Sequence, residues 1–429
     1  MVKSILKAAA PGQSDRRGSD RPLVLYVATA ADTLRVLSGQ LRYLAEKGFD
    51  VIYVSSAGRI RDEMSPQHFL SLIEGVKTIE VPMAREITPV RDLLALWRLW
   101  RIIRTLRPAV TNVGTPKAGL IGGIAAWLNR IPCRFYTLHG LRFETTSGLK
   151  RWLLVFAECL ACRLAHRVVC VSPSVREKAV AFGLVNRKRT VVLASGSCDG
   201  VDVPRFAPTP RMMKRAAALR SELRVPKNAP VIGFSGRLTR DKGIPELMEA
   251  FLRLGDRFPD LRLLLLGRFE NEDPIPSESR KFLESHPRVI FRGIVEDPAP
   301  YYSVMDLLVL PSHREGLPTV VLEAQAAGKP VVAARATGIV DAVVDGETGL
   351  LFPVGDAAAL TKAAARLLSD HALARKLGRA GHERASREYQ PERIREALRQ
   401  EYLELLQIKE LVRAIPVVKS GSGYEAQAQ

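Results

Sequence analysis

Short apolar runs alternate with amphipathic stretches along the chain from Pro22 onward. Runs of β-branched and aliphatic residues predict buried strands, and apolar residues that recur every three or four positions predict helices. The expected strands are 23–28, 51–55, 109–113, 134–138, 167–171, 231–235, 261–267, 289–292, 307–311 and 331–334. The expected helices are 36–47, 90–106, 118–128, 150–165, 243–257, 319–327, 357–368, 372–389 and 391–413. This alternation favours an α/β protein in which helices cover both faces of parallel sheets.

The alternation breaks once, in a proline-rich basic segment after residue 205, and then restarts. We therefore expect two facing Rossmann-like domains joined by a linker. The expected organisation is a mobile basic leader at 1–21, a first domain at 22–205, a linker at 206–228, a second domain at 229–390, a C-terminal helix at 391–413 and a disordered tail at 414–429. The leader lacks the apolar core of a signal peptide. Open α/β sheets bind ligands at the carboxyl ends of their strands, so we expect the active site in the crevice between the domains.

The charge of the chain is uneven. The formal net charge is +19, of which residues 1–205 carry +15 with 31 basic and 16 acidic residues. An electrostatic partner should therefore meet the first half of the chain. A nucleic-acid binder is one alternative, but the sequence has no zinc knuckle, RNP motif or basic-aromatic groove, so nucleic acid is not expected as a partner.

Cysteine usage predicts a reducing, cytoplasmic compartment, because the five cysteines are an odd number without a disulfide framework. The pair Cys159-x-x-Cys162 lies in an apolar run without a second such pair, so buried thiols are favoured over a zinc or redox site. The longest nearly apolar stretch, 118–128, is shorter than the roughly 20 residues that span a bilayer. The sequence contains no P-loop, no GxGxxG and no Asp-x-Asp pair, so neither a metal nor a cofactor is expected.

The segment 311–324 holds the most informative candidate site. The segment is predicted to contain the end of a strand, a loop with Glu315 and Gly316, and the start of a helix. Glu323 lies on that helix. Free backbone amides at a helix start bind anions such as a diphosphate. The expected donors lie along Leu317, Pro318, Thr319 and Val320, where every residue except the proline has a backbone N–H. Carboxylates accept hydrogen bonds from vicinal hydroxyls, although two ordinary solvated glutamates remain an open alternative.

A second cluster, at 234–243, follows another predicted strand. Gly236 permits a ligand to approach the backbone closely. The planar guanidinium of Arg237 and the ammonium group of Lys242 are both suited to binding phosphate oxygens. Basic loops are common on surfaces, so this cluster alone is a weak signal.

Together these motifs resemble the retaining family-4 glycosyltransferases of GT-B fold. The resemblance rests on Gly236-Arg237 with Lys242-Gly243, Glu315-x7-Glu323, Gly200-Val201-Asp202 and the turn Gly346-Glu-Thr-Gly349. It covers about residues 22–410 and implies a C-terminal helix that returns toward the first domain. The runs 115–119 and 267–274 are most similar to enzymes that extend polyprenyl-diphosphate-linked saccharides for bacterial surface polysaccharides.

The resemblance implies a role for each matched residue. Arg237 and Lys242 hold the donor diphosphate and stabilise the leaving nucleoside diphosphate. Glu315 contacts the donor sugar, Glu323 binds the ribose, and His139 lines the donor-sugar site. The remaining donor-binding positions are Gly39 as a close-approach glycine, Gly236, Gly316, the amides of Leu317 to Val320, and Gly293, Ile294 and Val295 around the base. Relatives often carry Gly-Gly where this chain has Ser38-Gly39. They also often carry a glutamate where this chain has Asp341, so Asp341 is kept outside the candidate site.

The implied reaction is metal-independent transfer of a sugar from a nucleotide sugar, UDP-linked by family resemblance, to a polyprenyl-diphosphate-linked saccharide, with retention. A nucleotide-sugar epimerase of the same architecture and a non-catalytic membrane scaffold are the alternatives.

The predicted helix 90–106 suggests a membrane partner. Its core stripe is Leu96, Leu99, Ile102, Ile103 and Leu106. Its other face mixes tryptophan with arginine, as interfacial helices do against anionic headgroups. The expected membrane-facing residues are Trp97, Arg98, Trp100, Arg101 and Arg104. A core helix with a solvated basic face remains open, but the prediction is a cytoplasmic protein peripheral on the inner face of the cytoplasmic membrane.

Overall fold

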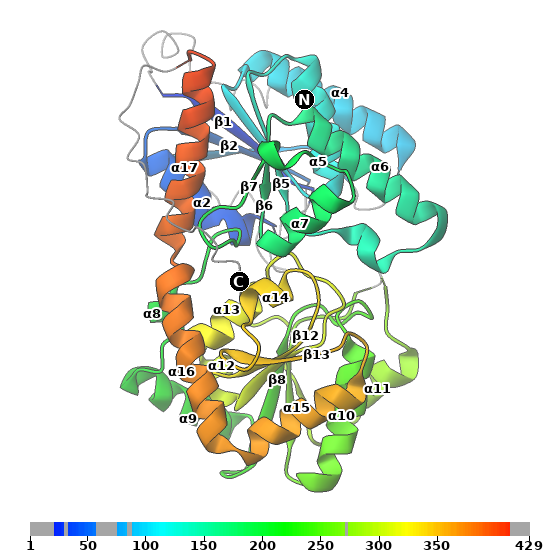
Figure 1. Cartoon of the computed structure of the whole chain (residues 1–429), viewed down its shortest axis with the longest axis vertical. Coiled ribbons are helices and arrows are strands. Elements are labelled where there is room, and N and C mark those ends of the chain that lie inside the picture. The colour runs from blue at the N-terminus through cyan, green and yellow to red at the C-terminus, as the bar shows by residue number, and fades with distance from the viewer. Residues whose placement is uncertain (1–20, 30–32, 57–74, 84–87, 271–272, 412–429) are drawn as a thin grey trace, which may run out of the picture.

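The computed structural model describes residues 21–29, 33–56, 75–83, 88–270 and 273–411. These residues form two α/β domains, which lie one above the other in Figure 1. The predicted tail and all of the predicted leader except Arg21 lie outside the described residues.

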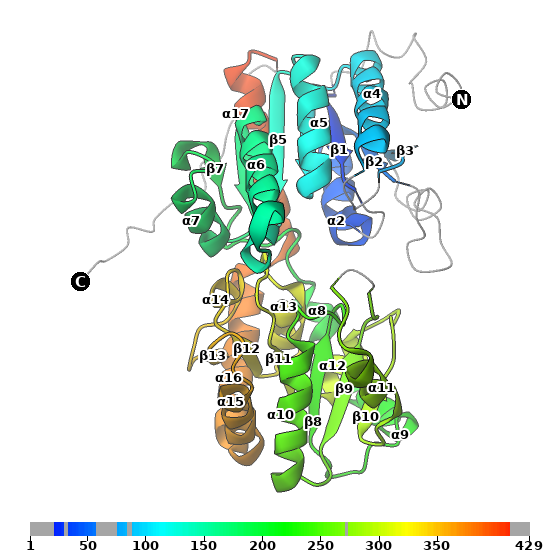
Figure 2. The ribbon, with the colours of Figure 1, turned by 90° about the vertical axis from the view of Figure 1, so that its right-hand side faces the viewer.

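The first domain is built on a parallel sheet, whose order among the described residues is β3-β2-β1-β4-β5-β6-β7. Its strands are β1 (Leu23–Val27), β2 (Asp50–Ser55), β3 (Val76–Glu80), β4 (Val110–Gly114), β5 (Cys133–Leu138), β6 (Arg167–Cys170) and β7 (Thr190–Val191). Its helices are α2 (Thr33–Glu46), α4 (Pro89–Leu106), α5 (Pro116–Leu128), α6 (Gly148–Leu164) and α7 (Pro173–Ala181), with 3-10 turns at Arg142–Thr145 and Arg187–Arg189. Helices α4, α5 and α6 cover one face and lie side by side in Figure 2. Because both faces are buried, the central strands are nearly continuous apolar runs.

The second domain repeats this design with the strand order β10-β9-β8-β11-β12-β13 among the described residues, again all parallel. Its strands are β8 (Val231–Ser235), β9 (Arg262–Leu266), β10 (Val289–Phe291), β11 (Leu307–Leu310), β12 (Val331–Ala334) and β13 (Gly349–Phe352). Its helices are α8 (Val203–Phe206), α9 (Pro210–Glu222), α10 (Ile244–Arg257), α11 (Ser277–Ser285), α12 (Ala299–Val304), α13 (Thr319–Ala326), α14 (Ile339–Ala342), α15 (Ala357–Ser369) and α16 (His371–Glu388).

The segment predicted as a linker, 206–228, instead belongs to the second domain. Helix α9 occupies most of it and packs against α12, and its Met212 and Ala216 lie in the core of that domain. Pro210 stands in the first turn of α9, where the missing proline N–H costs no hydrogen bond, and the Thr209 hydroxyl accepts from the Met212 amide at 3.2 Å. The prolines that suggested a break in the chain therefore mark a helix start.

The C-terminal helix returns to the first domain, as predicted. Helix α16 lies on the second domain, and α17 (Pro391–Ile408) continues along the same side of the molecule to the first domain (Figure 1). There α17 and α2 cover the second face of the sheet, with Ile394, Leu398 and Leu406 in the core. The Tyr402 hydroxyl accepts a hydrogen bond from Asn112 Nδ2 at 2.6 Å. The chain therefore completes its first domain with its last described helix.

The cysteines carry free thiols in all five positions. Cys162 is buried among the side chains beneath α6, and Cys159 is half-buried beside that core. Burial raises the pKa of Cys133 to about 11, so this thiol is protonated at neutral pH.

Candidate active site

Loops from the carboxyl ends of both sheets meet at the boundary between the domains. The loop after β5 carries His139 and Gly140, and the loop after β11 carries Glu315 and Gly316. A Cβ atom on Gly316 would lie 2.0 Å from the His139 carbonyl oxygen. Glycine at 316 is therefore required for this close approach of the two backbones.

Hydrogen bonds between polar side chains and backbone groups join the same loops across the boundary. They run from Arg314 Nε to Thr145 Oγ1 (2.7 Å), from Thr337 Oγ1 to Glu144 Oε1 (2.8 Å), from the Gly338 amide to Ser174 Oγ (2.7 Å) and from the Ser174 amide to Asp341 Oδ2 (3.0 Å). Asp341 was kept outside the candidate site, and the pairing of these residues could not be predicted from the sequence, because the partners lie more than 150 positions apart.

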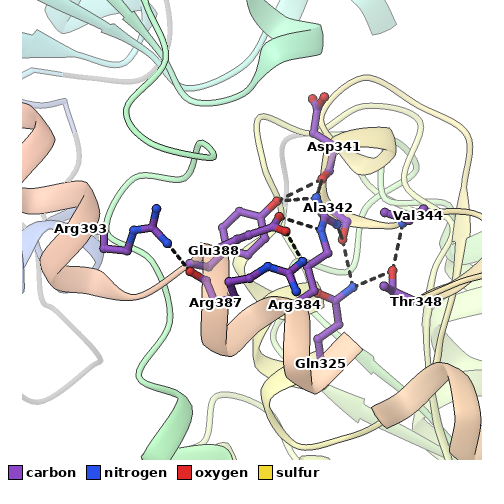
Figure 3. Close-up of polar contacts among 10 residues, drawn as sticks. Gln325, Asp341, Ala342, Val344, Thr348, Arg384, Arg387, Glu388 and Arg393 are labelled. Carbon is purple, nitrogen blue, oxygen red and sulfur yellow. Dashed lines mark hydrogen bonds and ion pairs between the residues drawn. The ribbon is translucent and has the colours of Figure 1, made fainter. Parts of the chain in front are cut away.

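Asp341 is held in place through its backbone. Arg384 donates to the carbonyl oxygens of Asp341 at 2.7 Å and Ala342 at 2.8 Å, and Gln325 Nε2 donates to Ala342 O at 2.9 Å. Figure 3 shows this network, from which the Asp341 carboxylate points away. The carboxylate reaches Ser174 of the first domain, so Asp341 serves the contact between the domains.

Lys242 and Glu315 form an ion pair between two loops of the second domain. Lys242 Nζ lies 2.6 Å from Glu315 Oε1, and each side chain is 15% exposed. Lys242 comes from the loop after β8 and Glu315 from the loop after β11, strands that are neighbours in the sheet. Gly243 lets these loops touch, because a Cβ atom there would lie 2.2 Å from the Pro311 carbonyl oxygen. The sheet therefore sets a cation and a carboxylate next to each other before any ligand binds.

Arg237 lies beside a second group of charges. Its guanidinium is 3.5 Å from Glu270 and 3.8 Å from Asp241, which also accepts from Arg314 Nη2 at 3.0 Å. Burial alone would raise the pKa of Asp241, but the hydrogen bond from Thr239 and the nearby cations outweigh burial and lower it. Asp241 thus stays ionised and holds the two arginines near each other. Arg314 lies in the candidate segment 311–324, but its pairing with Asp241 was not predicted.

Helix α13 begins at Thr319 without a side-chain cap, behind the buried residues Leu317 and Pro318. The amides of its first turn are therefore available to an anion. Glu323 lies one turn further along, and the Tyr302 hydroxyl donates to its Oε2 at 2.6 Å. Burial raises the pKa of Tyr302 well above its usual value, so the phenol remains a donor. Tyr302 is a further residue that the sequence analysis missed.

His139 is half-buried at the end of β5, with Nδ1 3.0 Å from Cys198 Sγ. Burial lowers the pKa of His139 to about 4, so the imidazole is neutral at physiological pH. A neutral imidazole offers one donor and one acceptor nitrogen.

The residues expected around the base follow β10. Gly293 adopts φ +64° and accepts from the Gly267 amide at 2.7 Å, Ile294 is exposed, and Val295 packs against the domain core. An open groove of about 570 Å³ next to them is lined by Ile294, Val295 and Tyr301, among others.

Gly39 differs from its expected place. It lies inside α2 rather than in a strand-end loop, and a Cβ atom there would lie 1.9 Å from Arg395 Nη2. The guanidinium of Arg395 pairs with Asp199 at 2.7 Å. Packing against the Arg395–Asp199 ion pair explains the glycine, and the atoms nearest to Gly39 belong to this pair rather than to Arg237 or Lys242.

The outer face of the first domain exposes apolar residues on two helices. On α4 the core stripe is buried as predicted, except that Leu96 is half-buried. Trp97 is 48% exposed beneath the Arg101 guanidinium, whereas Trp100 packs partly against the core, which corrects its expected outward position. The exposed apolar residues in the first halves of the two helices are Val90, Leu93, Leu94 and Trp97 of α4 and Leu149, Trp152, Leu153 and Phe156 of α6. We call this set the α4–α6 apolar face; α5 lies between the two helices (Figure 2).

Two facing parallel-sheet domains with this cationic loop cluster define a GT-B glycosyltransferase. The first domain matches the "Glycosyl transferase 4-like domain" model over residues 33–196, and the second matches "Glycosyl transferases group 1" over 229–370. The chain is 32% identical over 379 residues to the capsular polysaccharide biosynthesis glycosyltransferase CapM of Staphylococcus aureus, covering 88% of this chain and 96% of that protein. The chain therefore belongs to the group 1 glycosyltransferase family.

One further relative and one solved structure are also similar to this chain. An Escherichia coli UDP-Gal:alpha-D-GlcNAc-diphosphoundecaprenol alpha-1,3-galactosyltransferase is 24% identical over 348 residues, which cover 79% of this chain and 85% of that protein. The crystal structure of Anabaena HepE in complex with UDP and glucose superposes with a TM-score of 0.74 at 20% identity, over 90% of this chain and 100% of that chain. The predicted GT-B fold and glycosyltransferase class are confirmed, and the epimerase alternative is not favoured.

Proposed function

We propose that this enzyme transfers a sugar from a UDP-sugar to a polyprenyl-diphosphate-linked saccharide in polysaccharide biosynthesis, with retention at the anomeric carbon and without a metal. The observation that carries the proposal is the Lys242–Glu315 ion pair, which lies in the same loop cluster as Arg237 and the uncapped start of α13. This arrangement combines positive charge for a diphosphate with a carboxylate for sugar hydroxyls.

Donor binding exchanges the partners of the ion pair. A diphosphate oxygen takes the place of the Glu315 carboxylate at Lys242 Nζ, and the released carboxylate accepts a hydrogen bond from the donor sugar. As the glycosidic bond breaks, negative charge grows on the leaving UDP, and preorganised cations and amides stabilise it. Lys242, Arg237 and the α13 amides supply this charge, which is why we propose that no metal is needed.

The nucleoside is held further along the same helix. Glu323 accepts from the ribose hydroxyls while Tyr302 fixes the orientation of its carboxylate. The backbone of Gly293, Ile294 and Val295 binds the base. The assignment of uridine is supported by the names of the E. coli relative and of the HepE complex, which both contain UDP.

The acceptor class is supported by the relatives. The E. coli enzyme acts, by its name, on a diphosphoundecaprenol-linked sugar, and so does a Campylobacter jejuni relative that is 28% identical over 306 residues. Such an acceptor lies in a bilayer. We therefore propose that the protein binds peripherally to the cytoplasmic membrane surface.

The α4–α6 apolar face and its flanking cations support membrane binding. Trp152 is 72% exposed, and the neighbouring cations include Arg91, Arg98, Lys150 and Arg151. Exposed tryptophan and leucine next to arginine suit an anionic lipid surface. Among the described helices, none combines the length and the apolar content of a membrane span.

Vesicle co-sedimentation tests the membrane proposal. We expect a double variant, Trp97→Ser with Trp152→Ser, to lose binding to vesicles rich in anionic lipid. Trp127→Ser is a matched control, because Trp127 is also exposed, at 54%, but lies in the last turn of α5. Equal binding of the double variant and the control would contradict the proposal.

The reaction is tested with a panel of UDP-sugars and an undecaprenyl-diphosphate-linked N-acetylhexosamine as acceptor. We expect a product with the anomeric configuration of the donor, formed at the same rate with and without EDTA. An inverted product would refute retention, and activity that EDTA abolishes and Mn²⁺ restores would refute metal independence. Isomerisation of the nucleotide sugar without an acceptor would replace the proposal with the epimerase alternative.

A further inference from the structure

A thiol lies directly behind the imidazole of His139. Cys198 Sγ comes from the loop between β7 and α8, 59 residues after His139, and lies 3.0 Å from its Nδ1. The loop that carries this thiol is fixed on both sides. The Ser197 amide donates to the Val171 carbonyl at 2.7 Å, and Gln40 Nε2 donates to the Cys198 carbonyl at 3.0 Å. The thiol therefore occupies a defined position behind the ring.

The protons of this contact can be assigned from its surroundings. Burial, with a contribution from the Asp199 charge, raises the pKa of Cys198 to about 12, so the group is a thiol. The imidazole of His139 is neutral and carries one N–H. An imidazole nitrogen is a better acceptor than a thiol sulfur, which favours donation of S–H to Nδ1. With that donation, the single ring proton lies on Nε2.

The other edge of the ring packs closely against a glycine. Gly114 ends β4, and a Cβ atom there would lie 2.9 Å from His139 Nε2. A larger residue at 114 would therefore cover this nitrogen. Within the part of the chain that the structure describes, Nε2 has no protein hydrogen-bond partner. One ring nitrogen is thus satisfied from inside the first domain, whereas the edge that carries Nε2 faces Gly114 on a residue that is only half-buried.

We propose that Cys198 is a positioning residue, whose thiol holds His139 in the tautomer that donates Nε2–H to an oxygen of the bound sugar. The proposal rests on the proposed glycosyl transfer, in which His139 lines the donor-sugar site. In this role His139 is a neutral hydrogen-bond donor, and no proton leaves the ring.

The tautomer is measured on the whole chain by nitrogen NMR with ¹⁵N-labelled histidine, using His139→Gln to identify the two signals. We expect a protonated Nε2 and an unprotonated Nδ1 in the wild type and in Cys198→Ser, whose hydroxyl also donates. Cys198→Ala should shift the signals toward a mixture of tautomers. Cys162→Ala, which removes another buried thiol of the same domain, should change nothing. A proton on Nδ1 in the wild type, or an unchanged tautomer in Cys198→Ala, would overturn the proposal.

Kinetics then connect the tautomer to the reaction. We expect Cys198→Ala to lower kcat/KM about three- to tenfold, which is the usual effect of losing one hydrogen bond, and Cys198→Ser to restore most of it. A shifted tautomer with unchanged kcat/KM would refute the positioning role. The NMR experiment needs no substrate, so it decides the tautomer separately. Absence of sugar transfer by the wild type would instead overturn the proposed function, and with it the substrate role of His139.

Discussion

Replacing Lys242 by alanine separates a catalytic role of the Lys242–Glu315 ion pair from a structural one. The substitution removes a cation that lies 2.6 Å from its carboxylate and is 15% exposed. Two consequences compete. The transition state loses a positive charge next to the departing diphosphate, and Glu315 loses its partner in a half-buried place.

The two consequences differ in size. Exposed ion pairs contribute less than about 1 kcal/mol, whereas breaking a buried pair costs about 3–5 kcal/mol. Because the Lys242–Glu315 pair is partly buried, its loss should lower the free energy of unfolding by about 1–2 kcal/mol. A domain with about 5–15 kcal/mol of stability remains folded after such a loss. Removing one preorganised group that stabilises developing charge costs about 3 kcal/mol of transition-state energy, or about 100-fold in kcat. The activity should therefore fall far more than the stability.

The assay is kcat and KM for the donor, measured beside thermal unfolding for Lys242→Ala, Glu315→Gln and the double variant. If Lys242 acts on the diphosphate, the double variant stays as inactive as Lys242→Ala. If the loss only reflects an unpaired Glu315, the double variant recovers, and recovery to within about tenfold of the wild type would refute the reasoning. Arg253→Ala is the matched control, since it breaks a pair with Glu249 on the exposed face of α10 and should leave kcat unchanged.

Three further substitutions test other parts of the molecule. Tyr302→Phe should raise KM for the donor about three- to tenfold with little change in kcat, because Glu323 loses the hydrogen bond that orients it; an unchanged KM would argue against ribose binding there. Gly316→Ala should lower kcat/KM at least about tenfold, because its Cβ would push the two domain loops apart, and a fully active variant would contradict this close approach. Glu158 is buried, and burial raises its pKa to about 7. Since the unfolded chain ionises this carboxyl first, the folded state loses about 1.4 kcal/mol per pH unit as the pH rises from about 4.5 to 7. Denaturant unfolding of Glu158→Gln should lack this component, so wild-type and variant stability curves that run parallel in that interval would refute the shift.

The amino-acid sequence by itself determined the strands, the long helices and the strand-end motifs. The predicted strands 231–235 and 331–334 coincide with β8 and β12, because a fully buried parallel strand is a continuous apolar run bounded by turn residues. Lys242 and Glu315 could be found in the same way, since each follows such a run and neighbouring strands end at one edge of a sheet. Short or weakly patterned elements such as β3, β13 and α12 were missed.

Only the tertiary structure decided which distant residues serve those motifs. Tyr302 beneath Glu323, Asp241 between two arginines, and Cys198 behind His139 have no local signal, because their partners are set by strand order and by the contact of the two domains. The orientation of Trp100 is a further case. A helical wheel separates the two faces of a helix, but it does not show how far neighbouring helices cover each face. Trp100 was predicted to face outward, but it packs partly against the core. Sequence periodicity is a property of one element, whereas a site made from several elements depends on how they pack.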